Sequence, residues 1–291
     1  MPYTPTPRPP CRLFALFARR APLALIFRRG PTDWVRLILW HTDTDEFAFG
    51  QWFKGRIYER RCDLSPDGSL LVYFVRKISA RTVKDKRYTY AWTAISKPPY
   101  LTALALWPKG DCWAGGGLFE RNGSLMLNHG PAQAEPHPLH VPPKSFRMRP
   151  NPAARGEDAP IFFQRLLRDC WQVTQQWPGQ KVYLSGVRDD APKVMVHKHP
   201  SLPFQIQLNW TVDGYILSDE MAVTDLQGWP VVDTSTVNWL DWDQRGRLIV
   251  LRGGKILVGD HVNNGFVLRE LSDFNAQEPN PLPAPDWATR W

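Results

Sequence analysis

Short apolar runs, separated by glycine, proline and aspartate, follow one another along the chain from residue 23 onward. The run at residues 23–27 ends at Gly30 and Pro31, and the run at residues 34–40 ends in the polar stretch 41–46. Apolar runs of this length between turn-forming residues indicate β-strands. Residues 161–177 are the best helix candidate, although a strand fits them nearly as well. The pattern predicts an all-β chain.

Two distant hairpins share one pattern. The segment "RCDLSPDGSLLVYF" around Gly68 and the segment "LDWDQRGRLIVL" around Gly246 both read Asp, four residues, Gly, one residue and three apolar residues. Aligning the two glycines pairs Asp63 with Asp241 and starts both apolar triplets at the same position. Because glycine accepts the positive φ of a tight turn, we predict that both glycines are corresponding corners of one repeated unit.

Weaker echoes of this unit occur at Gly110, at residues 122–127 and at residues 213–214, which gives a degenerate period of roughly 40 to 45 residues. The stretch "SPDGSLLVYF" resembles the blade signature of TolB-like and WD40-type β-propellers, and "WLDWDQRGRLIVLRGGKILV" resembles a closing blade. The resemblance implies a β-propeller-like fold of about five or six irregular blades with a Pro-rich insertion. The hairpins of a β-sandwich are the alternative.

The resemblance concerns structure and is nearly silent on activity. The stretches "WVRLILW" and "YLTALALWPKGD" also resemble segments of a bacterial family to which no established function attaches. We predict five segments along the chain: a flexible Arg/Pro-rich leader (1–22), N-terminal blades (23–130), a Pro-rich linker or insertion (131–160), C-terminal blades (161–276) and a Pro-rich tail (277–291).

The distribution of charge along the chain argues against one class of partner, the nucleic acids. The formal net charge is +8, but residues 1–32 contain six arginines and no acid, so the remaining chain is nearly balanced. A surface that neutralises many phosphates should be basic along its body, which argues against a nucleic-acid partner. The apolar run near the N-terminus is broken by Arg19 and Arg20, and therefore fits neither a secretory signal nor a membrane span. We expect a cytoplasmic protein that does not contact membranes.

Sequence motifs for cofactors and catalysis are absent from the chain. It has no phosphate-binding glycine loop, no nucleophile elbow and no HExxH helix, and its four cysteines form no CxxC pair. We read the glycine cluster Gly115–Gly117 as structural rather than anion-binding. His197 and His199 could form a two-ligand metal clip with Asp189 or Asp190, but a chance His-x-His is commoner. We expect no cofactor and no resident metal.

One segment has the composition of a binding surface. With a period of two, five residues of the stretch 50–61 share one strand face: Trp52, Lys54, Arg56, Tyr58 and Arg60. Guanidinium groups and aromatic rings on one face can recognise an acidic or planar partner. The alternative is that these side chains cover a solvated strand face. We propose them as partner-binding residues.

The carboxylates of the repeated unit admit two interpretations. We expect a structural turn role for six residues: Asp63, Asp67, Gly68, Asp241, Asp243 and Gly246. A hydrolase would instead gather several of these acids with Asp43, Asp45, His197 and His199 in one pocket.

The sequence therefore favours a non-enzymatic propeller-like module that binds a macromolecular partner, with a protein as the favoured partner. The alternative is a hydrolase with a carboxylate/His site at the propeller mouth that acts on a glycan or a phosphoester. The sequence leaves the oligomeric state open.

Overall fold

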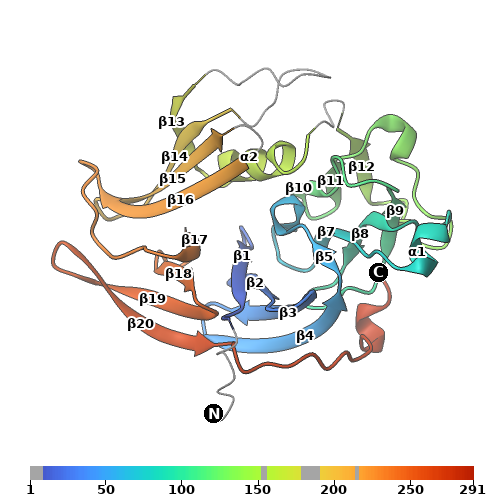
Figure 1. Cartoon of the computed structure of the whole chain (residues 1–291), viewed down its shortest axis with the longest axis horizontal. Helices are drawn as coiled ribbons and strands as arrows, with labels where there is room; N and C mark the ends of the chain where they lie inside the picture. Colours follow the sequence, from blue (N-terminus) through green and yellow to red (C-terminus); the bar gives the residue numbers. More distant parts are fainter. Residues whose placement is uncertain (1–8, 152–155, 178–190, 214–215) are drawn as a thin grey trace, which may run out of the picture.

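The computed structural model describes residues 9–151, 156–177, 191–213 and 216–291, which form five β-sheets around a common centre (Figure 1). Each sheet is built from strands that are consecutive in the chain, so the protein is a five-bladed β-propeller. The prediction of an all-β propeller of about five or six blades is confirmed. The finer likeness to TolB-like or WD40-type propellers stays a prediction.

The first blade begins inside the segment that the sequence analysis assigns to a flexible leader. Its four antiparallel strands follow chain order and are β1 (Arg12–Phe17), β2 (Leu23–Arg29), β3 (Trp34–His41) and β4 (Glu46–Lys54). Both faces of β1 are buried, with Leu13 and Ala15 on one and Phe14 and Leu16 on the other. The leader prediction is therefore wrong for residues 12–17, because the prolines before them hid a well-formed apolar strand.

The second blade carries the hairpin at Gly68. Its strands are β5 (Arg56–Ile57), β6 (Asp63–Leu64), β7 (Leu71–Arg76), β8 (Ala91–Ser96) and β9 (Ala105–Pro108), with the 3-10 turn η1 (Glu59–Arg61) and the short helix α1 (Ala80–Lys84) in the connections. Both β5 and β6 pair with β7, so together they occupy the position of a single first strand.

The third blade has three strands, and the last of them lies in the Pro-rich segment. β10 (Gly117–Arg121) pairs with β11 (Ser124–Leu127), and β12 (Arg147–Pro150) pairs with β11 in parallel; η2 (Pro131–Gln133) lies between them. The segment predicted as a linker or insertion is therefore part of a blade in its second half.

The helix-or-strand ambiguity after residue 160 has a mixed outcome. α2 (Ala159–Arg168) is a helix that lies between the third and fourth blades, and β13 (Gln172–Gln176) follows it (Figure 1). The fourth blade continues with β14 (Lys193–Lys198), β15 (Phe204–Asp213) and β16 (Ile216–Asp225).

The last blade closes the ring against the first. It contains β17 (Val237–Trp242), β18 (Leu248–Arg252), β19 (Lys255–Val262) and β20 (Gly265–Asp273). The Asn275 side chain accepts a hydrogen bond from the Cys11 amide at 2.9 Å, and Arg28 Nε donates to the Phe274 carbonyl at 3.2 Å. Because the two blades share no strand, side chains hold this seam.

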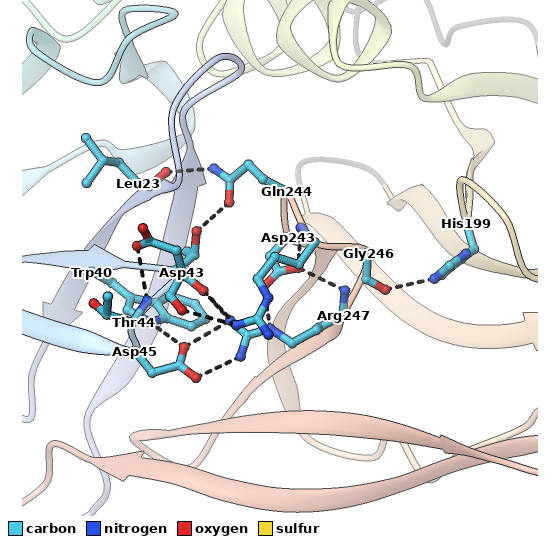
Figure 2. A network of polar contacts seen from close by, with 12 residues as sticks. Leu23, Trp40, Asp43, Thr44, Asp45, His199, Asp243, Gln244, Gly246 and Arg247 are labelled. Carbon is cyan, nitrogen blue, oxygen red and sulfur yellow. Dashed lines mark hydrogen bonds and ion pairs between the residues drawn. The ribbon is translucent and has the colours of Figure 1, made fainter.

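Figure 2 shows a second part of the seam, at the turn after β17. Arg247 donates to both oxygens of Asp45, at 2.7 and 2.9 Å, and to Asp243 at 2.7 Å. Gln244 accepts a hydrogen bond from the Thr42 hydroxyl at 2.9 Å and donates to the Leu23 carbonyl at 2.9 Å. The acids Asp45 and Asp243 thus pair with an arginine that joins blades 1 and 5.

After β20 the chain continues as an extended tail with one 3-10 turn, η3 (Asp286–Ala288). The Leu282 carbonyl accepts from Gln51 at 3.1 Å, the Trp287 carbonyl accepts from Lys97 at 3.0 Å, and Trp291 Nε1 donates to the Leu104 carbonyl at 3.2 Å. The tail therefore binds to blades 1 and 2. Within the described ranges, no helix is long and apolar enough to cross a membrane.

The core consists of apolar strand faces and large aromatic side chains between the sheets. Trp40, Trp107 and Trp210 are fully buried, as expected for residues that fill the space between blades. His129 is also buried: one ring nitrogen faces the Gln133 carbonyl at 2.8 Å and the other faces the Thr93 hydroxyl at 2.8 Å. With Nδ1–H donating to the carbonyl, Nε2 accepts from the hydroxyl, so the imidazole is neutral.

Burial lowers the pKa of His129 to about 4. The unfolded chain, with a histidine pKa near 6.5, binds this proton more readily than the folded protein does. The free energy of unfolding is therefore highest above about pH 6.5 and falls as the pH drops towards 4. We expect this residue alone to remove about 3 kcal/mol of unfolding free energy over that range. Urea unfolding of wild type and His129→Gln at both ends of the range measures the difference. Equal pH slopes for the two proteins would contradict the assignment.

Candidate functional site

The segment from Gly50 to Arg61 does not form the single strand face predicted for it. β4 ends at Lys54, and Gly55 turns the chain with φ +147° into β5. A Cβ atom at Gly55 would lie 2.8 Å from the Arg76 carbonyl, so the turn depends on glycine. The five predicted partner-binding residues are therefore divided between two places.

Trp52 and Lys54 lie on β4, away from the centre of the ring. Trp52 is buried, packs edge-on against Trp34 at 6.4 Å and lies beneath the guanidinium groups of Arg28 and Arg36. Lys54 is exposed beside the Trp34 ring. Trp52 belongs to the core of blade 1, so its prediction as a partner-binding residue is corrected.

Arg56, Tyr58 and Arg60 line a cavity of about 340 Å³. Its wall is formed by β1, β2, β5, η1, β16 and β17 and by the residue before α2, so that it lies where blades 1, 2, 4 and 5 meet. We call it the central cavity. Its other lining residues are Arg12, Leu13, Phe14, Phe27, Arg29, Glu59, Asp158, Asp219, Val237 and Asn238.

Each carboxylate of the central cavity is engaged by an arginine. Arg60 binds Asp219 at 2.7 Å, and Arg29 approaches Glu59 at 3.5 Å. The third acid, Asp158, accepts a hydrogen bond from Arg61 Nε at 2.7 Å. The acids are therefore part of the wall, and a ligand that needed a free carboxylate would have to displace an arginine.

Two arginines of the central cavity have no such partner. Among the described residues, Arg12 and Arg56 form no ion pair with a carboxylate, whereas Arg60 is fixed by Asp219 and by the rings of Phe162 and Trp210. Arg56 lies 5.3 Å from the centre of the Tyr58 ring, which supports its guanidinium from one side. The cavity thus has an excess of positive charge, which suits an anionic group.

Glu59 of the central cavity has a raised pKa. Burial raises its pKa, and the nearby charge of Asp158 adds to the rise, while Arg56 and Arg60 oppose it. The carboxyl group therefore takes up a proton at a higher pH than an exposed glutamate does.

Arg61 lies behind the wall of the central cavity and binds Asp158. Its side chain is fully buried, with Nη1 donating to the carbonyls of Cys112 and Ala114 at 2.7 Å each. Gly116 lies against it: with φ +80°, a Cβ atom there would be 2.0 Å from the Arg61 carbonyl oxygen. The Gly116 amide donates to the Thr93 hydroxyl at 2.8 Å, so this part of the glycine cluster is structural, as predicted.

The hairpin glycines are corresponding corners, as the repeat predicts. Gly68 and Gly246 have φ +73° and +75° and both lie between the first and second strands of a blade. Asp63 pairs across the hairpin with Val72, and Asp241 with Ile249. The alignment after the glycine is therefore shifted by one residue, because the turn of blade 2 is one residue longer.

Two of the predicted turn acids hold their turns. Asp67 accepts hydrogen bonds from the Ser65 hydroxyl at 2.6 Å and from the Ser69 amide at 3.0 Å. Asp243 accepts from the amides of Arg245 and Arg247 at 2.9 and 2.8 Å. These are the backbone contacts expected of a turn anchor.

Asp63 bonds to other elements instead, which corrects its predicted role, whereas Asp241 accepts from the Trp242 amide at 2.9 Å and also contacts another blade. Asp63 is buried and accepts from Arg168 of α2 at 2.6 and 3.0 Å and from the Phe119 amide at 2.8 Å. Asp241 lies 3.1 Å from the Nδ1 atom of His197 in blade 4. Both acids therefore connect blades.

The residues expected of a hydrolase do not meet in one pocket. Asp45 and Asp243 belong to the Arg247 seam, while Asp63 pairs with Arg168. His199 uses both ring nitrogens. Its Nε2 donates to the Gly246 carbonyl at 2.8 Å (Figure 2), and its Nδ1 accepts from the Ser201 and Leu202 amides. The proposed third metal ligands, Asp189 and Asp190, lie outside the described residues.

Most of the central cavity was not predicted from the sequence. Arg12 lay in the presumed leader, and Arg29 and Asp219 gave no local signal. Glu59 lies within the segment that the sequence analysis singled out, but on the other parity of the expected strand.

The sequence matches no protein-family model and no curated protein. Among solved structures, the chain is similar to a mutant GH43 protein from Bacillus licheniformis, with 12% identity and a TM-score of 0.36 over 99% of this chain and 60% of that one. It is also similar to a proposed 6-phosphogluconolactonase from Bacteroides fragilis, with 10% identity and a TM-score of 0.21 over 95% of this chain and 70% of that one. The chain thus spans 60% of the length of the Bacillus protein. We draw no conclusion about function from either of these two similarities.

Proposed function

We propose that the protein is a non-enzymatic propeller module that binds another protein, and that an acidic group of the partner enters the central cavity. The observation that carries this proposal is the charge of the cavity: Arg12 and Arg56 lack carboxylate partners among the described residues, while Glu59, Asp158 and Asp219 are each engaged by an arginine. A carboxylate that enters would meet guanidinium donors without displacing an existing pair.

The surrounding frame supports a binding role. Four blades contribute to the wall, and Arg60 is held between Asp219 and two aromatic rings. Such a preformed site loses little conformational entropy when a ligand binds. The rigid ring also places loops from several blades around one opening, which is how propellers commonly present binding surfaces.

Hydrolysis of a glycan or a phosphoester is the second candidate, and Glu59 favours it. A general acid needs a raised pKa, and burial raises the pKa of Glu59 in a cavity that also contains Asp158 and Asp219. The binding role is preferred because all three carboxylates are occupied by arginines. A hydrolase would depend on Glu59, whereas acidic-ligand binding would depend on Arg12 and Arg56.

Selection from a phage-displayed library of random peptides tests the binding role. We expect wild type to enrich peptides that contain Asp or Glu, because an acidic side chain complements the unpaired guanidinium groups. The double variant Arg12→Gln/Arg56→Gln should lose this enrichment, while the exposed control pair Arg81→Gln/Arg87→Gln should keep it. If wild type and the cavity variant select the same peptides, or no acidic preference arises, the proposal fails.

A further inference from the structure

A second hollow lies beside the central cavity and shares a wall with it. It measures about 410 Å³ and is lined by Arg76, Ile78, Val83, Tyr90, Asp111, Cys112, Trp113 and Glu157. We call it the rim hollow. Glu157 lines this hollow, while its chain neighbour Asp158 lines the central cavity, and Arg61 binds both acids. The two spaces are therefore close enough for one short extended segment to reach both.

The rim hollow is unusual for its exposed apolar side chains. Ile78, Val83 and Trp113 are 62%, 59% and 66% exposed, although they lie in one concave surface. Large apolar side chains that gather around a hollow commonly mark an interaction site, whereas single exposed ones do not. Trp113 combines a large apolar ring with an N–H donor, as anchoring residues at interfaces often do.

The rim hollow, like the central cavity, is lined by an arginine that has no carboxylate partner among the described residues. Asp111 is paired with Lys109 at 2.7 Å and Glu157 with Arg61 at 3.2 Å. Arg76 forms no ion pair with a carboxylate among the described residues. Three arginines, Arg12, Arg56 and Arg76, are thus left to attract an acidic partner to a surface that also offers an apolar hollow.

We infer that the protein binds a short extended protein segment in which an acidic residue is followed closely by a large apolar side chain. The acid enters the central cavity, and the apolar side chain packs against Trp113, Ile78 and Val83 in the rim hollow. This inference rests on the proposed binding function and adds the second subsite. A peptide is favoured over a single-stranded nucleic acid because the aliphatic side chains of Ile78 and Val83 line the rim hollow beside Trp113 and suit an apolar side chain.

Fluorescence polarisation with three labelled peptides tests the inference. The first contains two glutamates followed by phenylalanine and leucine in a Gly/Ser background. The second replaces the apolar pair with serines, and the third replaces the glutamates with glutamines. We expect the first to bind wild type about tenfold more tightly than either of the others, because only it fills both subsites.

Exposed tryptophans provide matched variants. Trp113→Ala should weaken the first peptide about tenfold and leave the second unchanged. Trp229→Ala removes a tryptophan that is 72% exposed at a site outside both cavities and should change neither. Thermal unfolding of each variant confirms that the fold is retained.

The outcomes separate the two proposals. If the first and second peptides bind equally well and Trp113→Ala has no effect, the rim hollow is no subsite, while acidic binding at the central cavity stands. If the third peptide binds as well as the first, or no peptide binds, both proposals fail. Tighter binding of a labelled oligothymidylate than of the first peptide would also overturn the inference.

Discussion

Replacing Arg61 with methionine is expected to lower the free energy of unfolding by about 3–5 kcal/mol. The guanidinium is fully buried and donates to Asp158 and to the carbonyls of Cys112 and Ala114, each at 2.7 Å. Methionine fills a similar volume but leaves the buried carbonyls without donors and the carboxylate without its counter-charge. Each unsatisfied buried group costs about 1–3 kcal/mol.

Urea unfolding of the Arg61→Met variant measures this loss. Arg149→Met provides the control, because Arg149 also binds a carboxylate, Glu120, but its side chain is 54% exposed. Exposed ion pairs contribute about 0–1 kcal/mol, so this variant should be nearly as stable as wild type. Equal losses for the two variants would mean that the buried network around Arg61 does not stabilise the fold.

The second large effect is expected at Gly116. A methyl group there has to accommodate φ +80° and a 2.0 Å approach to the Arg61 carbonyl oxygen, so the backbone of blade 2 or blade 3 must move. The left-handed conformation costs a non-glycine residue roughly 1–2 kcal/mol, and overpacking costs a further 1–3 kcal/mol. We therefore expect Gly116→Ala to destabilise the protein by about 4 kcal/mol.

Gly123→Ala is the matched control in the same blade. No atom lies within 4 Å of the position that its Cβ would occupy, and its φ is not in the left-handed region. Thermal and urea unfolding should place this variant within about 0.5 kcal/mol of wild type. A Gly116→Ala protein as stable as the control would show that the contact between blades 2 and 3 adapts without cost.

The strands of the propeller could be predicted because their causes are local. Alternation of apolar and polar residues sets which side of a strand is buried, and glycine at positive φ sets the corners at Gly68 and Gly246. Both signals lie within a few residues. The leader and the linker were misread for different reasons: prolines before β1 outweighed its apolar run, whereas β12 contains one large apolar residue, Met148, and ends in a proline.

The central cavity could not be predicted in the same way. Arg12, Glu59 and Asp219 come from blades 1, 2 and 4, and they meet because the ring closes. Asp63 is a second example of a residue whose distant partner does not follow from the local sequence. Its place in the hairpin follows from the repeat, but its partner Arg168 is supplied by a helix 105 residues away. Local pattern thus gives the position of a side chain in its strand and leaves its partners open.

Because side chains from distant parts of the chain close the ring, we expect the protein to fold slowly. The contacts Cys11–Asn275, Arg28–Phe274 and Thr42–Gln244 join residues that are 264, 246 and 202 positions apart. Bringing such distant residues together costs chain entropy before any contact repays it, and topologies of this kind fold slowly. Individual hairpins can form from local contacts alone, whereas the cavity between blades requires these distant contacts as well.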